Sequence, residues 1–96
     1  MTEKQFLAAV VELAGYLGLL VYHTYDSRRS DPGFPDLVLA GDRGVIFAEL
    51  KTGQGQLSPA QVKWHYRLQA AGAAWRLWRP CHLQSGEIQR DMKGIA

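Results

Sequence analysis

The sequence predicts an α/β fold in which helices flank a mixed central sheet. Two observations support this class: apolar residues recur at helical spacing in two segments, and short β-prone runs bounded by turn formers lie before and after the second of them. Their order along the chain is αβββαβ. A length of 96 residues is enough for one modest core. We therefore expect a single domain covering residues 1–96.

The first helix is predicted over residues 3–17, with Thr2 as its N-cap. Its apolar positions recur at helical spacing and comprise Phe6, Leu7, Val10, Leu13, Ala14 and Leu17. At 100° per residue, Glu3 falls inside this apolar arc and Glu12 falls nearly opposite to it. Glu3 is therefore expected to face inward, where a carboxylate needs a metal or a basic partner, and Glu12 to face water.

A β-hairpin is the most informative feature of the chain. Residues 19–25 form a β-prone run, followed by a polar segment at 26–33. Two further β-prone runs, at 37–40 and 45–51, enclose the turn-forming sequence Gly-Asp-Arg-Gly at 41–44. These last two runs are expected to pair as an antiparallel hairpin.

The register of this hairpin brings charged side chains together. If the turn is tight, Ala40 faces Val45, Asp36 then lies opposite Glu49, and Lys51 shares the face of Glu49. Two opposed carboxylates repel each other unless a divalent cation lies between them, and Mg²⁺ favours carboxylates, waters and phosphate oxygens. The hairpin therefore predicts a metal-dependent nuclease site, in which Lys51 offsets charge on a phosphate or orients the attacking water.

The second half of the chain predicts one more helix and one more strand before a short last helix. Ser58 and Pro59 are typical of an N-cap and first helical position. Trp64, Trp75 and Trp78 are expected in the core or a subunit interface and not as base-stacking surfaces, and exposed Tyr66, Trp75 and Leu77 are interface candidates. The elements expected here are a loop at 52–56, a helix from Pro59 to near Gly72, a strand at 74–79 and a helix at 83–93.

Composition narrows the class of protein. Charged residues make up 21% and apolar residues 47%, which indicates a globular chain. The single Cys81 excludes an intramolecular disulfide and fits a reducing cytoplasm, that of a bacterium or a phage-infected cell. The histidines lack zinc-ligand spacing, and the apolar stretch at 8–21 is too short to span a bilayer. The net charge of +2 is compatible with DNA binding once three acids are assigned to metal.

Each of these residues also has a simpler interpretation. Glu49 and Lys51 fit a same-face surface ion pair, and Asp36 fits a turn cap. Glu3 is favoured in a first helical turn by the macrodipole, and Gln61 fits an exposed helix surface.

The assembled motifs resemble the VRR-NUC family of the PD-(D/E)XK nuclease superfamily, in its small stand-alone form. The resemblance covers nearly the whole chain and rests on Glu3, Tyr22-His-Thr24, Ser27-Arg-Arg-Ser30, Gly33-Phe-Pro-Asp36, Phe47-Ala-Glu-Leu-Lys51, Leu57-Ser-Pro-Ala-Gln61 with Trp64, and Trp78-Arg-Pro80. It implies a restriction-endonuclease-like core, Mg²⁺ or Mn²⁺ dependence and cleavage of branched DNA. Stand-alone members resemble homodimeric Holliday-junction resolvases, and the same domain in larger repair proteins acts on flaps.

The resemblance also implies roles for single residues. Asp36 and Glu49 correspond to metal ligands, Lys51 to the catalytic lysine, Glu3 to a helix-borne acid and Gln61 to a supporting residue. The backbone carbonyl of Leu50 is expected to complete the metal site, and Glu3 to bind a second ion or its water shell. Phosphate contacts are expected from Ser27, Arg28, Arg29 and Ser30.

The sequence thus favours a metal-dependent, structure-specific DNA endonuclease that resolves four-way junctions as a homodimer, since two symmetric cuts need two sites. A flap or nicking nuclease, and a DNA-binding module without catalysis, remain alternatives. No membrane partner and no nucleotide cofactor are expected.

Overall fold

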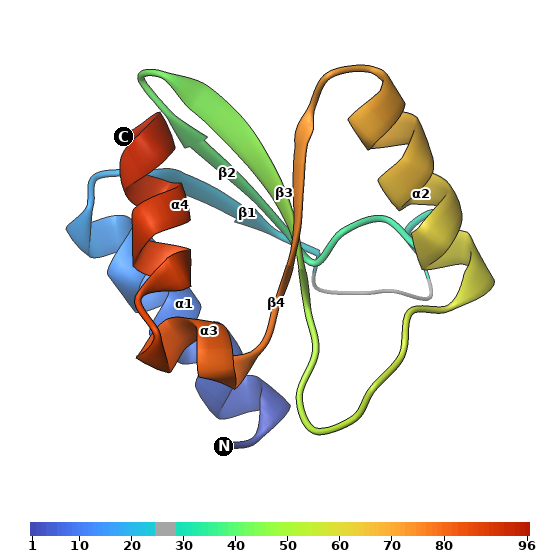
Figure 1. The fold of residues 1–96 in the computed structure, drawn as a ribbon, viewed down its shortest axis with the longest axis horizontal. Coiled ribbons are helices and arrows are strands. Elements are labelled where there is room, and N and C mark those ends of the chain that lie inside the picture. The colour runs from blue at the N-terminus through green and yellow to red at the C-terminus, as the bar shows by residue number, and fades with distance from the viewer. Residues whose placement is uncertain (25–28) are drawn as a thin grey trace.

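A computed structural model describes residues 1–24 and 29–96 and confirms the α/β class (Figure 1). Its elements follow the expected order. They are α1 (Glu3–Tyr16), β1 (Leu20–His23), β2 (Leu37–Gly41), β3 (Gly44–Leu50), α2 (Pro59–Ala70), β4 (Ala74–Trp78), α3 (Pro80–Gln84) and α4 (Glu87–Ile95). None of the described helices is long and apolar enough to cross a membrane.

The four strands form one mixed sheet in the order β1-β2-β3-β4. The first three strands are antiparallel neighbours, whereas β4 runs parallel to β3. A parallel pair needs a crossover connection, and α2 supplies it. Figure 1 shows α2 on one side of the sheet, with α1, α3 and α4 on the other. The sheet therefore has one face covered by three helices and one face covered by a single helix.

The hydrophobic core lies between the sheet and α1 and α4. Alternate residues of the strands face it, as the period of two requires. On α1, Phe6, Val10 and Ala14 are spaced four residues apart and are fully buried. The remaining core members are Leu19, Leu37, Leu39, Ile46, Ala48, Trp78, Ile88, Met92 and Ile95.

The hairpin register is confirmed. Ala40 lies opposite Val45, and the next pair, Gly41 with Gly44, leaves only Asp42 and Arg43 in the turn. The Arg43 guanidinium donates to the backbone carbonyls of Lys93, at 2.9 Å, and Ala96, at 3.1 Å. The hairpin tip is thereby fixed against the C-terminal end of α4.

Some element ends differ from the sequence predictions. The first helix ends at Tyr16, with Leu17 as its C-cap, one residue before the expected end. The first strand covers only Leu20 to His23, whereas residues 19–25 were expected; Tyr25 lies outside the described residues.

The C-terminal region also differs from the prediction of one helix at 83–93. Pro80 begins α3, so β4 ends at Trp78 and not at 79. Gly86 has a φ of 84°, a left-handed conformation that interrupts the helical hydrogen bonds. Two helices, α3 and α4, therefore replace the single predicted one.

Gly33 offers a test of how the loop before β2 is held against α2. Its φ is 82°, and a Cβ at this position would lie 2.3 Å from the backbone carbonyl carbon of Ala60. Gly72 has a similar φ of 87° with no atom within 4 Å of its Cβ position. We expect Gly33→Ala to lower the free energy of unfolding by about 3 kcal/mol, since strain and overpacking add, and Gly72→Ala by about 1 kcal/mol. Urea denaturation measures both, and equal losses would contradict the rigid contact with α2.

Candidate active site

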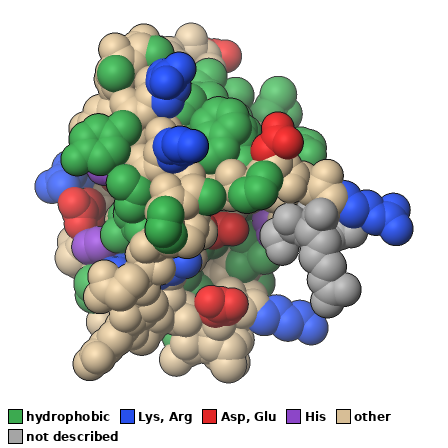
Figure 2. Space-filling view, turned by 90° about the vertical axis from the view of Figure 1, so that its right-hand side faces the viewer, with side chains coloured by type: hydrophobic (Ala, Val, Ile, Leu, Met, Phe, Trp, Pro, Cys, Tyr) green, Lys and Arg blue, Asp and Glu red, His purple; other side chains and the backbone are tan. Residues whose placement is uncertain are grey.

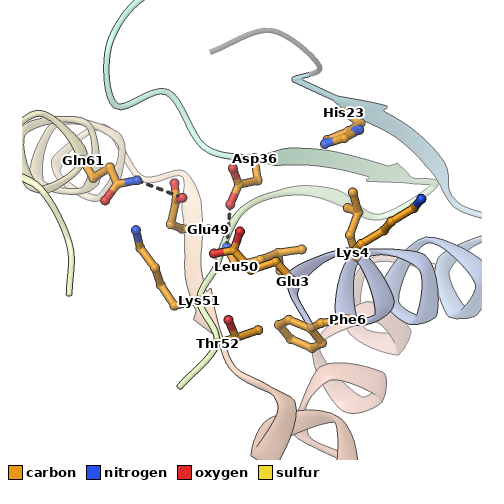
Figure 3. A pocket seen from close by; sticks show the side chains of 11 residues that line it. Glu3, Lys4, Phe6, His23, Asp36, Glu49, Leu50, Lys51, Thr52 and Gln61 are labelled. Atoms are coloured by element: carbon orange, nitrogen blue, oxygen red, sulfur yellow. Dashed lines mark hydrogen bonds between the residues drawn. The ribbon is translucent and has the colours of Figure 1, made fainter. Parts of the chain in front are cut away.

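Two acidic side chains meet where β2 begins and β3 ends. The register that pairs Leu37 with Ala48 places Asp36 beside Glu49, and the backbone N–H of Leu50 donates to Asp36 Oδ2 at 2.8 Å. This bond holds the Asp36 carboxylate against the end of β3. The predicted proximity of the two carboxylates is confirmed (Figure 3).

The backbone of Leu50 contributes a second polar group here. In a strand, the N–H and C=O of one residue point to the same side, because paired residues exchange both bonds with one neighbour. Lys51, the next residue, directs its N–H to the carbonyl of Trp78 on β4 at 3.1 Å. The Leu50 carbonyl is therefore directed to the β2 side, toward Asp36.

Glu49 is a buried acid, with 2% of its surface exposed. Burial, the hydrogen bond to Asp36 and the negative charge of Asp36 raise the pKa of Glu49 to about 9, and the charge of Lys51 lowers it. At neutral pH the carboxyl is therefore protonated unless a cation takes the place of the proton. The interpretation of Glu49 and Lys51 as a surface ion pair is wrong, since Glu49 is buried and no described ion pair joins it to Lys51.

Gln61 connects this acid to α2. Ser58 is the N-cap, as predicted, and its backbone N–H donates to Gln61 Oε1 at 2.8 Å in a capping box. The other end of the amide, Nε2, donates to Glu49 Oε1 at 3.0 Å. Because the cap engages the oxygen, the amide can present only its NH₂ group to the carboxylate. Gln61 is thus part of the site and not merely exposed helix surface.

A cavity of about 460 Å³ opens in front of these groups. Lys51 and Gln61 border it, together with Thr52 and with residues from α1 and β1 (Figure 3). Lys4 brings a second cation to the same space. The full lining is Glu3, Lys4, Phe6, Leu7, His23, Asp36, Glu49, Leu50, Lys51, Thr52 and Gln61.

Glu3 is placed differently from the prediction. It borders the cavity, but it is exposed, so the expectation that it faces the interior is wrong. Glu3 is the first residue of α1, and the side it faces is the solvent-open cavity and not the core. Glu12 faces solvent, as predicted.

The predicted DNA contacts lie partly outside the described residues. Ser27 and Arg28 belong to that part, whereas Arg29 and Ser30 border another cavity, beside α1 and β1. Lys4 and His23 line both cavities, so the two adjoin. The role of these residues stays a prediction. Lys4 was missed by the sequence reasoning, although its place beside Glu3 in the first helical turn is a usable signal.

Two predictions about aromatic residues have different outcomes. Trp75 and Trp78 belong to the interior, as expected, with 9% and 1% of their surfaces exposed. Trp75 stacks on His65 of α2 at 3.9 Å between ring centres. The prediction that Trp75 is an exposed interface candidate is therefore wrong, whereas Tyr66 is exposed as predicted.

The donor set fits a hard divalent cation. No group of three histidine, cysteine or acidic side chains gathers anywhere in the described residues, which excludes a zinc-like cage among them. Asp36, Glu49 and the Leu50 carbonyl offer oxygen donors only, and Mg²⁺ takes few protein oxygens and keeps several waters. The pKa of Glu49 is raised mainly by burial and further by the hydrogen bond to Asp36 and its negative charge, and a bound cation would favour the ionised form. The residues present therefore fit Mg²⁺ or Mn²⁺.

Comparisons with known proteins agree with this geometry. No protein-family model and no curated protein matches the sequence. A solved structure named "VRR_NUC domain protein" has a TM-score of 0.71 and 19% identity, covering 97% of this chain and 89% of that chain. The holliday junction resolvase Hjc of Archaeoglobus fulgidus has a TM-score of 0.51 and 25% identity, over 76% of this chain and 63% of that one. These likenesses confirm the predicted nuclease-type fold.

A third solved structure decides the family. It is named "VRR_NUC domain", is 30% identical over 73% of this chain and 80% of its own length, and has a TM-score of 0.57. The sequence motifs, the mixed sheet and this level of identity agree, and the chain belongs to the VRR_NUC family.

Proposed function

We propose that this protein is a metal-dependent, structure-specific DNA endonuclease that hydrolyses phosphodiester bonds in branched DNA. The observation that carries the proposal is the buried Glu49, which is hydrogen-bonded to Asp36, in a cavity that both acids and Lys51 line. Burial of an acid against a second acid costs stability, and such strongly perturbed pairs are typical of functional sites. The relation to the VRR_NUC domains and to a Holliday junction resolvase supports the same reaction class.

The roles of the residues follow from their places. Asp36, Glu49 and the Leu50 carbonyl would hold Mg²⁺ or Mn²⁺, which supplies a Lewis acid for the scissile phosphate and a bound water of lowered pKa. Lys51 offsets the negative charge that develops on the phosphate or orients the attacking water. Gln61 holds Glu49 in position, and Glu3 binds a second ion or its water shell. Lys4 adds positive charge for a neighbouring phosphate.

We also propose that the active form is a homodimer. Residues opposite each other in an antiparallel pair share a face, so Leu20 and Tyr22 lie on the face of Ala40, Val38 and Val45. On this face α2 packs mainly against β4, and Gln61 reaches Glu49 at the end of β3. Leu20 is 77% and Tyr22 63% exposed, and β1 is an edge strand. A second copy pairing there would give the two sites that symmetric cleavage of a junction needs.

The proposed activity is tested with labelled four-way junctions, flaps, nicked duplexes and plain duplexes, in Mg²⁺, in Mn²⁺ and in EDTA. We expect cleavage of the junction on two opposed strands, and no cleavage in EDTA. Asp36→Asn and Lys51→Ala are expected to lose at least about 10²-fold in rate, because each removes a group that acts on the transition state.

The same panel separates the alternatives. Cuts confined to one strand of a flap or at a nick would favour a flap or nicking nuclease. Binding to DNA without any cleavage in either cation would show a DNA-binding module. Cleavage by Lys51→Ala at the wild-type rate would remove the assigned site.

The role of Gln61 in positioning Glu49 can be tested against a matched glutamine in α1. Gln61→Ala and Gln5→Ala each remove the third residue of a capping box, in α2 and α1 respectively, so each is expected to cost about 1 kcal/mol of stability. Only Gln61 also donates to Glu49. We expect Gln61→Ala alone to need about 10- to 100-fold more Mg²⁺ for half-maximal cleavage. An equal Mg²⁺ requirement in the two variants would reduce Gln61 to a helix cap.

The dimer is tested by placing a charge on the open sheet face. Tyr22→Arg is expected to convert a dimer to a monomer, as measured by light scattering. Dimerisation of this variant would bury an unpaired guanidinium in an apolar contact, which costs free energy. Tyr16→Arg is the matched control, since Tyr16 is 86% exposed at the end of α1, away from this face. A wild-type protein that is monomeric at all concentrations tested, or a Tyr22→Arg variant that still dimerises, would contradict the interface.

A further inference from the structure

A second cavity, of about 550 Å³, lies along α2 beside the candidate active site. It is lined by Pro32, Pro59, Ala60, Lys63, Trp64 and Arg67, none of which has a role in the chemistry described above. Ala60 immediately precedes Gln61, which borders the active-site cavity, so the two cavities meet the same first turns of α2. Figure 2 shows the face that carries α2, with Lys and Arg side chains beside hydrophobic ones in its upper part; acidic side chains lie elsewhere on the same face, both in its upper part and below.

The apolar part of this cavity is held rigidly. The Trp64 indole N–H donates to the backbone carbonyl of Pro32 at 3.1 Å, and the indole meets the ring of Phe34 edge to face, with 5.0 Å between ring centres. Gly33 is pressed against the backbone of Ala60, as its lack of space for a Cβ shows. Trp64 and Pro32 therefore form a fixed hydrophobic surface and do not need to rearrange before a ligand binds.

The charged part of the cavity is entirely positive. Lys63 and Arg67 are exposed and lie one helical turn apart, about 6 Å along the axis. No acidic residue lines the cavity, and neither cation has an ion pair within the described residues 1–24 and 29–96. Two adjacent cations without an acidic partner match the repeated phosphates of one nucleic-acid strand.

We propose that this cavity binds an unpaired nucleotide of the branched DNA, next to the strand segment that enters the active site. Its base packs on Trp64 and the two prolines, and the flanking phosphates contact Lys63 and Arg67. A paired duplex shows only its backbone to such a groove, because its base faces are stacked inside, and the aromatic surface would gain nothing. The site thus distinguishes an unpaired nucleotide of a branched DNA from paired duplex. This inference rests on the proposed nuclease function.

The test measures DNA binding in EDTA, where no hydrolysis is expected, on two DNAs with equal numbers of phosphates: a paired duplex and a duplex with an unpaired tail. The double variant Lys63→Ala/Arg67→Ala is compared with Arg90→Ala/Lys93→Ala on α4, which removes the same charge on the other side of the sheet. We expect the first variant to bind the tailed DNA at least about tenfold more weakly, with the slope of log affinity against log salt reduced by about 2, and the second to bind like the wild type.

Trp64→Leu tests the base contact separately. We expect about a tenfold loss on the tailed DNA and less than about threefold on the duplex. Because Trp64 packs on Phe34, circular dichroism checks folding, and emission of 2-aminopurine in the tail of DNA bound to wild-type protein gives a second measure that needs no variant. Quenching on binding supports a stacked base.

The outcomes separate the inference from the proposed function. If the wild-type protein binds and cleaves branched DNA but the Lys63/Arg67 variant matches its α4 control, the inference fails alone. Equal losses on both DNAs, with no quenching, would show a contact to duplex backbone and would overturn the proposal for an unpaired nucleotide. If the wild type binds neither DNA and cleaves no branched DNA, the proposed function fails as well.

Discussion

The closeness of Asp36 and Glu49 is the constraint on which the rest of the site depends. The hairpin register places the two acids side by side, and the N–H of Leu50 holds Asp36 there at 2.8 Å. Burial of Glu49 then makes two negative charges untenable, which is why its pKa rises to about 9. The pair has two ways to reach a stable state: it keeps a proton or it gains a cation. Lys51 and Lys4 line the same cavity and bring positive charge to it.

The N-terminal capping box of α2 also positions one member of this pair, Glu49. The capping box satisfies the first backbone N–H groups of the helix and at the same time fixes which end of the Gln61 amide faces Glu49. A glutamate, the other common residue at this capping position, would cap the helix equally well but would place a third carboxylate against Glu49. The choice of amide over acid is therefore explained by the site and not by the helix.

Sequence reasoning reached the parts of the molecule that depend on local periods. The hairpin register, with Ala40 opposite Val45, follows from a period of two and a short turn, and it brought Asp36 and Glu49 together correctly. The orientation of the Gln61 amide was not predictable, because it requires knowing that Glu49 approaches the first turn of α2. The prediction that Glu3 faces the interior was wrong for a related reason. A helical projection reports which side of the helix a residue is on, but not whether another element covers that side.

One face of the sheet forms the hydrophobic core, and the other carries the candidate active site. Three helices cover one face, and its buried strand residues, Leu37, Leu39, Ile46 and Ala48, form the core with them. On the other face, α2 covers β4, where Trp75 stacks on His65. A chain of 96 residues buries only part of its surface on folding and is too short to form a second full core on this face. Polar residues at the end of that face and apolar residues left open on β1 can therefore serve chemistry and association without weakening the core that holds the hairpin in register.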